Sequence, residues 1–249
     1  MLLAQRDTTR REAGLSSIGF LAPWDTVVSH QFSGGTLECV SQSRSALRVD
    51  LGIAIAAILA FAWIAYGVTH GSSHSFDTAV RDAVHARASS YLTDVMIFIT
   101  NFGGGRFLWP FGAVIALVLL RQGRRREAAL FAIAVVGSEA LNETLKMLFH
   151  RARPEAYFGY PLPSTYSFPS GHSFVSYSFY LALAEILTSP EWPTAHKVAV
   201  WTAAGLLIGS IGLSRIYLGV HYPTDVIGGY TAAVAWTALL RAVHQGPPR

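Results

Sequence analysis

The sequence predicts an all-α fold, namely a polytopic membrane helical bundle of about six transmembrane helices with an interfacial helix between the first and second spans. Hydrophobic residues make up 51% of the 249 residues and charged residues only 14%, which is an unusual balance for a soluble protein. The apolar residues gather in long runs, and arginines flank several of them. Long apolar runs flanked by basic residues are typical of helices that cross a bilayer.

The chain divides into a polar N-terminal tail, a membrane-embedded domain and a short C-terminal tail. Residues 1–47 are rich in Ser, Thr, Gly and Arg and contain no apolar run that could span a bilayer, so we expect a mobile cytoplasmic tail. The first long apolar run starts too far along the chain for a cleavable signal peptide. We therefore expect the membrane domain at 48–243 and a C-terminal tail at 244–249.

The first predicted span, Leu51–Val68, is the clearest, because it carries no charge and crosses about 27 Å as a helix. Phe107–Leu120 is less regular, since it contains Pro110 and lies between two arginines. It spans the bilayer only if those arginines snorkel or if apolar residues before Gly103–Gly105 extend it. The remaining predicted spans are Ala128–Leu145, Phe174–Leu187, Val198–Leu213 and Val226–Leu240.

The segment Phe76–Ile99, between the first two spans, mixes apolar and charged residues at helical spacing. This pattern favours an amphipathic helix at the membrane interface. An ordinary solvated connector fits the same pattern. The charged residues concerned are Asp77, Arg81, Asp82, Arg87 and Asp94.

The distribution of arginines predicts how the bundle is oriented. Basic residues before the first span and between the second and third spans should lie in the cytoplasm. With six spans, both termini are then cytoplasmic, and the loops after the third and fifth spans face the periplasm or the exterior of a bacterial inner membrane. The arginines are Arg6, Arg10, Arg11, Arg44 and Arg48 before the first span, and Arg121, Arg124, Arg125 and Arg126 between the second and third.

The third span leads into a basic segment. Lys146 follows the apolar run, and Arg153, which precedes a proline, comes seven residues later. Because a proline disfavours helical geometry in the residue before it, we expect a helix that carries Lys146 and then unwinds into a loop that delivers Arg153. Glu143 can pair with Lys146 on one helix face, and we expect Glu139 and Asn142 to support the site rather than to form an ion pathway. Taken alone, the segment is also explained by interfacial positive charge.

The sequence Pro169-Ser170-Gly171-His172 lies directly before the fourth span. Ser170 resembles a helix N-cap, and Gly171 allows a ligand to approach the backbone closely. A helix start of this kind presents free N–H groups to an anion. A plain capped helix start accounts for the serine and the glycine but leaves His172 unexplained.

The third polar segment, Ser214 to Asp225, joins the fifth and sixth spans. Pro223 suits the first turn of a helix, which would leave His221 just outside the sixth span and Asp225 just inside it. A carboxylate there can hold one imidazole nitrogen while the other nitrogen faces the loop. An interfacial histidine beside a capping aspartate is the simpler alternative for this segment on its own.

The three segments together are more specific than any one alone. Lys-x6-Arg-Pro, Pro-Ser-Gly-His and Ser-Arg-x5-His-x3-Asp occur in this order between apolar runs. This arrangement resembles the type 2 phosphatidic acid phosphatase superfamily, which includes lipid phosphate phosphatases, undecaprenyl diphosphate phosphatases and soluble vanadium haloperoxidases. The resemblance covers about residues 50–243.

The resemblance implies a lipid phosphatase that needs no metal and no other cofactor. It implies that His221 attacks phosphorus to form a phosphohistidine, Asp225 orients His221, and His172 protonates the leaving lipid oxygen. The implied phosphate-binding residues are Lys146, Arg153, Ser170, Gly171 and Arg215. The implied partners are a lipid phosphate and the bilayer. The candidate substrates include phosphatidic acid, phosphatidylglycerol phosphate and undecaprenyl diphosphate, and the oligomeric state stays open.

Other classes of function fit less well. The single Cys39 excludes an intrachain disulfide, and no cysteine and histidine cluster indicates a structural metal. The net charge of +4 is not gathered on an aromatic-interleaved basic surface, so we expect no nucleic-acid partner. A haloperoxidase should be soluble, and a lipid transporter has no need of two opposed histidines, whereas a lipid phosphotransferase could use the same site.

Overall fold

The computed structural model of the protein describes residues 36–189 and 191–244, which form eight α-helices and no strand. The predicted all-α class is therefore confirmed for this part of the chain. The helices run α1 Thr36–Thr69, α2 His74–His85, α3 Ser90–Asn101, α4 Gly105–Arg121, α5 Arg125–Phe149, α6 Gly171–Leu187, α7 Thr194–Tyr217 and α8 Pro223–His244. Helix α1 begins before the predicted domain boundary, so residues 36–47 are helical, whereas 1–35 and 245–249 lie outside the described residues.

The expected number of six spans is not confirmed. In the described part of the chain, four helices are long and apolar enough to cross a bilayer: Ser45–Thr69 within α1, and the whole of α5, α7 and α8. A fifth span is possible if α3 and α4, which meet at a bend of 41°, cross together. That pairing matches the expectation that apolar residues before Gly103–Gly105 extend the second span.

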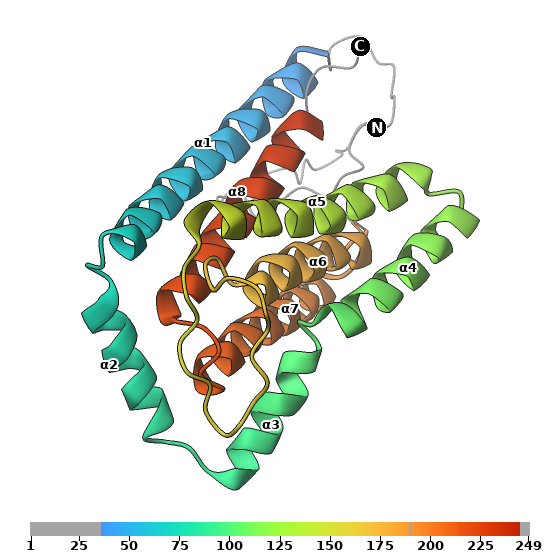
Figure 1. The fold of residues 1–249 in the computed structure, drawn as a ribbon. Coiled ribbons are helices and arrows are strands. Elements are labelled where there is room, and N and C mark those ends of the chain that lie inside the picture. The colour runs from blue at the N-terminus through green and yellow to red at the C-terminus, as the bar shows by residue number, and fades with distance from the viewer. Residues whose placement is uncertain (1–35, 190, 245–249) are drawn as a thin grey trace, which may run out of the picture.

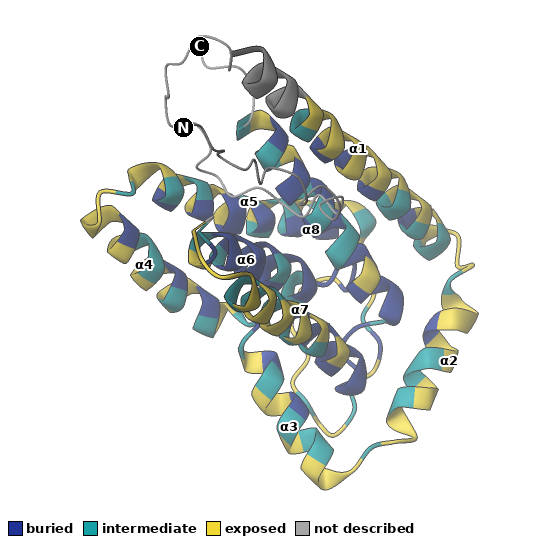
Figure 2. Ribbon diagram, turned by 180° about the vertical axis from the view of Figure 1, so that it is seen from behind, coloured by how far each residue is buried: buried dark blue, intermediate teal, exposed yellow. Residues whose placement is uncertain are grey.

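Helix α6 corresponds to the fourth predicted span, and it is shorter than the four helices that are long enough to cross a bilayer. It has only 17 residues and lies in the centre of the bundle, in contact with α5, α7 and α8 (Figure 1). Phe174 and Phe179 are fully buried, and the helix is dark blue for most of its length in Figure 2. Its apolar residues therefore pack against protein, whereas α1 exposes apolar side chains such as Ile55, Leu59 and Trp63.

The predicted single helix at Phe76–Ile99 is wrong in one respect, because the segment forms two helices. Helix α2 ends at His85, and α3 starts after Ser89, whose side chain accepts a hydrogen bond from the Leu92 N–H at 3.2 Å. A serine N-cap starts a new helix because it satisfies a backbone donor that a continuous helix would bond internally. A solvated connector does not fit either, since Asp77 on α2 is fully buried.

One end of the bundle collects the segments that carry the predicted chemistry. Helices α5 and α7 end there, α6 and α8 begin there, and α2 and α3 lie across the same end (Figure 1). The loop at 150–170 folds back over this end, where the Tyr157 N–H donates to the Leu218 carbonyl at 2.9 Å. The two predicted outward loops therefore meet in space.

Candidate active site

Lys146 and Arg153 lie where the sequence predicts. Helix α5 carries Lys146 in its last turn and ends at Phe149, followed by His150 in a left-handed conformation with φ of 49°. The Lys146 Nζ lies 2.6 Å from Glu143 Oε1, so the predicted helix-face pair is confirmed. The chain then unwinds into the loop that carries Arg153.

Backbone carbonyls hold the Arg153 guanidinium in place. It donates to the carbonyls of Thr165 at 2.7 Å, Val220 at 3.0 Å and Tyr166 at 3.1 Å. Its Nη1 also lies 2.9 Å from His221 Nε2. Burial, and after it the nearby Arg215 cation, lowers the pKa of Arg153 to about 10, so the guanidinium stays charged at neutral pH. A fixed positive charge thus stands directly beside the predicted nucleophile.

Ser170 and Gly171 form the start of α6. The Ser170 Oγ accepts from the Ser173 N–H at 3.5 Å and from the Ser173 hydroxyl at 3.1 Å, so Ser170 is the predicted N-cap. Its hydroxyl is fully buried and does not line the cavity described below, unlike Gly171 and His172. The start of α6 therefore lines the cavity at Gly171 and His172, whereas the Ser170 side chain caps the helix.

Arg215 connects the end of α7 with α3. It is almost fully buried and donates from Nη1 to the Thr100 hydroxyl at 2.7 Å, while its guanidinium lies 5.6 Å from the centre of the Tyr160 ring. Its Nε has no partner in the described part of the chain. The cation is thus positioned by α3 but keeps one donor unused.

His221 and Asp225 lie on either side of the α8 start, as predicted. Pro223 begins α8, and His221 Nδ1 lies 3.3 Å from Asp225 Oδ2. Because Arg153 can only donate to Nε2, the proton of a neutral His221 belongs on Nδ1. Burial lowers the pKa of His221 to about 4, with Asp225 partly opposing the change. The ring is therefore neutral, and its Nε2 lone pair faces Arg153 rather than Asp225.

A glycine makes the turn before His221 possible. Gly219 has φ of +75°, and a Cβ atom there would lie 2.7 Å from the Tyr157 nitrogen. The backbone N–H groups of Val220 and His221 both donate to the Arg215 carbonyl, at 3.2 and 3.3 Å. Only a residue without a side chain fits this tight approach, which fixes His221 relative to Arg215.

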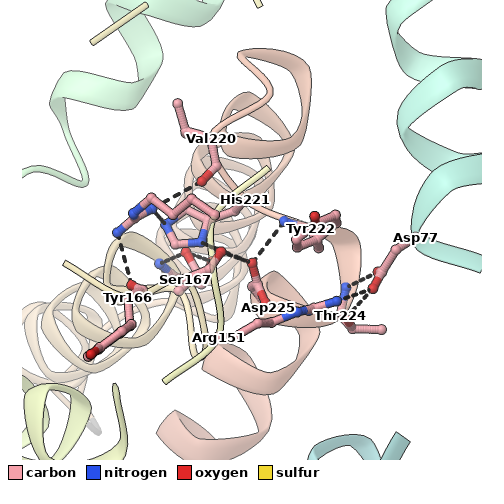
Figure 3. A network of polar contacts seen from close by, with 12 residues as sticks. Asp77, Arg151, Tyr166, Ser167, Val220, His221, Tyr222, Thr224 and Asp225 are labelled. Atoms are coloured by element: carbon pink, nitrogen blue, oxygen red, sulfur yellow. Dashed lines mark hydrogen bonds and ion pairs between the residues drawn. The ribbon is translucent and has the colours of Figure 1, made fainter. Parts of the chain in front are cut away.

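No sequence motif assigns a role to the residues behind Asp225, and Figure 3 shows how these residues are connected. Asp225 accepts from Ser167 Oγ at 2.5 Å and from the Tyr222 N–H at 2.8 Å, in addition to His221. Its other oxygen lies 2.6 Å from Arg151 Nη1. Each carboxylate oxygen therefore has at least one donor besides His221.

Arg151 extends this network to α2. Its Nη2 lies 2.7 Å from Asp77 Oδ2, and Asp77 also accepts from the Thr224 N–H at 2.9 Å and hydroxyl at 2.8 Å. Burial alone would lower the pKa of Arg151, but the Asp225 and Asp77 carboxylates raise it overall. Arg151 could have been suspected from its place beside Arg153, whereas no local signal marks Asp77.

A cavity of about 180 Å³ opens in front of His221. Six of the eight predicted site residues line it, and Ser170 and Asp225 lie behind its wall. Further lining residues include Trp109 on α4 and Glu139 and Asn142 on α5. The six are Lys146, Arg153, Gly171, His172, Arg215 and His221.

The sequence of this chain is similar to those of known proteins. Residues 127–248 match the family model described as the PAP2 superfamily. Phosphatidylglycerophosphatase B of Bacillus subtilis is 30% identical over 194 residues, which is 77% of this chain and 94% of that protein. The chain belongs to the PAP2 superfamily. Membership and the apolar helices make it a membrane hydrolase of the phosphatase type.

One further relative and one solved structure are also similar to this chain. An undecaprenyl-diphosphatase of Sulfolobus acidocaldarius is 30% identical over 154 residues, covering 60% of this chain and 68% of that protein. The crystal structure of a transmembrane PAP2-type phosphatidylglycerolphosphate phosphatase from Bacillus subtilis superimposes with a TM-score of 0.72 at 28% identity. The superposition covers 79% of this chain and 98% of the Bacillus subtilis chain. The helical arrangement is thus one that a transmembrane phosphatase of the superfamily adopts.

Proposed function

We propose that the protein hydrolyses a phosphomonoester or diphosphate of a membrane lipid through a phosphohistidine formed on His221. The observation that carries the proposal is the environment of that ring. Asp225 lies beside Nδ1, and Nε2 faces a cavity lined by Lys146, Arg153 and Arg215. A neutral imidazole held in this tautomer is a competent nucleophile beside cations that attract phosphate.

In the first step, the His221 Nε2 lone pair attacks phosphorus and the bond from phosphorus to the lipid oxygen breaks. His172 becomes protonated once the negative phosphate is bound beside it, and it passes that proton to the lipid oxygen as the oxygen leaves. The Arg153 contact to Nε2 gives way to the phosphate, so Arg153 turns from a partner of the nucleophile into a donor to the transferring group. Asp225 stabilises the positive charge that develops on the His221 ring.

In the second step, His172 takes a proton from water and the water oxygen attacks phosphorus. The bond from phosphorus to nitrogen breaks, inorganic phosphate leaves, and His221 returns to the neutral form. Lys146, Arg153 and Arg215 offset the phosphate charge in both steps, and the free N–H groups at the α6 start donate to its oxygens. Because these groups supply the charge stabilisation that a metal often gives, we propose a metal-independent reaction.

The experiment is phosphate release by the purified protein in detergent micelles containing a lipid phosphate. We expect His221→Ala to abolish release and to abolish an acid-labile phosphoprotein trapped during turnover. Release at the wild-type rate by His221→Ala would exclude the nucleophile. EDTA should leave the activity unchanged, and vanadate should inhibit by replacing the transferring group.

We also propose that the site faces the periplasm or cell exterior, with the phosphatase domain at 48–243 and both termini in the cytoplasm. In support, the arginine-rich turn between α4 and α5 lies at the opposite end of the bundle from the junction of α7 and α8 (Figure 1), which carries His221. Single cysteines test this in a Cys39→Ser background. An impermeant maleimide should label Glu155→Cys in intact cells but should not label Gln122→Cys, and the reverse pattern would invert the topology.

A further inference from the structure

The lining of the cavity changes from cationic to apolar with depth, and Glu139 lies where the change occurs. Because α5 ends and α6 begins at the site end of the bundle, residues earlier in α5 and later in α6 lie deeper in it (Figure 1). The apolar lining residues Leu108, Val135 and Val175 occupy this deeper part. On one face of α5, Glu139 follows Val135 by one helical turn and precedes Lys146 by two. The proposed mechanism gives no task to Glu139.

Glu139 lies level with the first turn of α6, which carries His172. A Cβ atom on Gly171 would lie 2.9 Å from Asn142 Nδ2, so these two positions face each other where α5 contacts α6. The two helices run in opposite directions, and Glu139 comes three residues, or about 4.5 Å, before Asn142. His172 follows Gly171 directly, and both it and Glu139 line the cavity. The Glu139 carboxyl group therefore shares the cavity with the proposed general acid at nearly the same depth.

The Glu139 carboxyl group is accessible and has no protein partner. The side chain is partly exposed and lines the cavity. Neither carboxyl oxygen belongs to the enclosed, unpaired polar atoms of the described residues, which do include Asn142 Oδ1. Lys146 pairs with Glu143 instead, at 2.6 Å, and no other described residue donates a hydrogen bond to Glu139. A molecule in the cavity can therefore reach this group.

Water is the partner that this carboxyl group requires. In either protonation state, a carboxyl group without hydrogen bonds in a low-dielectric interior is costly. One bound water needs roughly 10–15 Å³ and a few polar neighbours, and the cavity of about 180 Å³ offers both. A water held by Glu139 therefore fits beside a phosphate group held by the cations.

The position of Glu139 is also the position of the second acceptor. The phosphate is attracted to the cations and the hydrocarbon to the apolar part, so the bond that breaks in the first step lies between the two. Because attacking and leaving groups are roughly in line with phosphorus, the acceptor of the second step approaches from where the lipid oxygen left, opposite His221. His172 lies at that boundary with Glu139.

We propose that Glu139 binds the water that is the second substrate, and that it thereby makes the phosphohistidine react with water rather than with an alcohol. Glu139 holds the water oxygen in place, His172 takes the proton, and the oxygen attacks phosphorus as the bond to His221 nitrogen breaks. The same cavity without a water-binding group at this depth would favour transfer to a lipid hydroxyl. This inference rests on the proposed phosphohistidine mechanism.

The test measures how the phosphohistidine divides between two acceptors. Purified protein in detergent micelles receives radiolabelled phosphate on the lipid that the wild type hydrolyses fastest, together with methanol. Water yields inorganic phosphate and methanol yields methyl phosphate from one common intermediate. The ratio of the two products therefore does not depend on how much of the protein is folded or on how tightly the lipid binds.

Two variants of Glu139 should change this ratio to different extents. Glu139→Leu cannot hydrogen-bond water, so the ratio of methyl phosphate to inorganic phosphate should rise at least about tenfold, and more phosphoprotein should be trapped during turnover. Glu139→Gln keeps an acceptor oxygen, so its ratio should stay within about threefold of the wild type. Glu127→Gln, which removes a carboxylate from the same helix outside this cavity, is the matched control and should not change the ratio.

The outcomes separate the role of Glu139 from the underlying function. An unchanged product ratio in Glu139→Leu, even with both products reduced, would overturn the water-binding role and leave the phosphatase function intact. If methanol accepts no phosphate in any variant, the trapped phosphoprotein decides, and an unchanged amount in Glu139→Leu would overturn the role. A wild type that releases phosphate without any trapped phosphoprotein would instead refute the proposed mechanism.

Discussion

The two sides of His221 differ in how completely their polar groups are paired. Behind the ring, both Asp225 oxygens and both Asp77 oxygens accept hydrogen bonds or ion pairs without any ligand. In front of it, Asn142 Oδ1 and Arg215 Nε have no partner among the described residues. The polar groups behind the ring are therefore paired in the folded protein, whereas these two buried groups in front of it are not. Changes behind the ring should affect kcat and stability, and changes in front should affect substrate binding.

The largest effect should come from Asp225→Asn, behind the ring. The amide keeps the shape but loses the charge that stabilises a positive His221, so kcat should fall about 10⁴-fold while KM changes little. Phosphate release in micelles measures both constants. Asp94→Asn, an exposed carboxylate on α3, is the control. A fall in kcat of less than tenfold would remove Asp225 from the mechanism.

Asp77→Asn should have the next largest effect, although Asp77 does not line the cavity. Removing one partner of a buried ion pair costs about 3–5 kcal/mol of stability. The freed Arg151 should also shift Asp225, and such a displacement can lower kcat up to about 100-fold with KM preserved. Thermal unfolding and steady-state kinetics check the two effects.

Asp82→Asn is the matched control, because it removes an exposed carboxylate from the same helix. In the double variant with Arg151→Gln, the losses should be smaller than the sum of the single ones, since both remove one connected network. Purely additive losses would mean that Asp77 and Arg151 act separately.

The free energy of unfolding should depend on pH because His221 is buried in its neutral form. In the folded protein the pKa of His221 is about 4, whereas an exposed histidine has a pKa near 6.5. Between these values the unfolded chain binds the extra proton, so stability falls as the pH drops from about 6.5 to about 4. The contribution of His221 at pH 4 is a loss of about 3 kcal/mol.

Unfolding of the wild type and of His221→Asn at several pH values measures this contribution as a difference in slope. The variant should lose less stability than the wild type across that window. Parallel curves would show that His221 takes up its proton equally well in both states, and the ring would then not be a neutral nucleophile held by burial.

The smallest effect should come from Glu143→Gln, on the front side. The Glu143 side chain is 43% exposed, so its pair with Lys146 is screened by solvent. An exposed pair is worth at most about 1 kcal/mol, which limits the rise in KM to about fivefold. Glu127→Gln, which breaks the pair with Arg124 on the α4–α5 side, should leave KM unchanged. A large fall in kcat in Glu143→Gln would mean that the front side also positions the nucleophile.

The same contrast explains what could be predicted from the sequence. The end of α5, the cap at Ser170 and the start of α8 at Pro223 follow from local signals, and the structure has them there. The Asp77 to Arg151 pair has no local signal, because it joins residues 74 positions apart. Hydropathy also cannot tell lipid from protein interior, so the apolar run of α6 does not by itself distinguish a membrane span from a buried core helix.

The ion pair between Asp77 and Arg151 shows that the residues needed around the site extend beyond the segment that carries the motifs. Residues 127–248 match the superfamily and contain all eight predicted site residues, yet Asp77 and Thr100 come from helices before them. Cut from the chain, that segment would retain Arg151 without its Asp77 partner and Arg215 without its Thr100 partner. The region with the recognisable motifs is therefore not a transplantable module, and a chimera must carry α2 and α3 along with it.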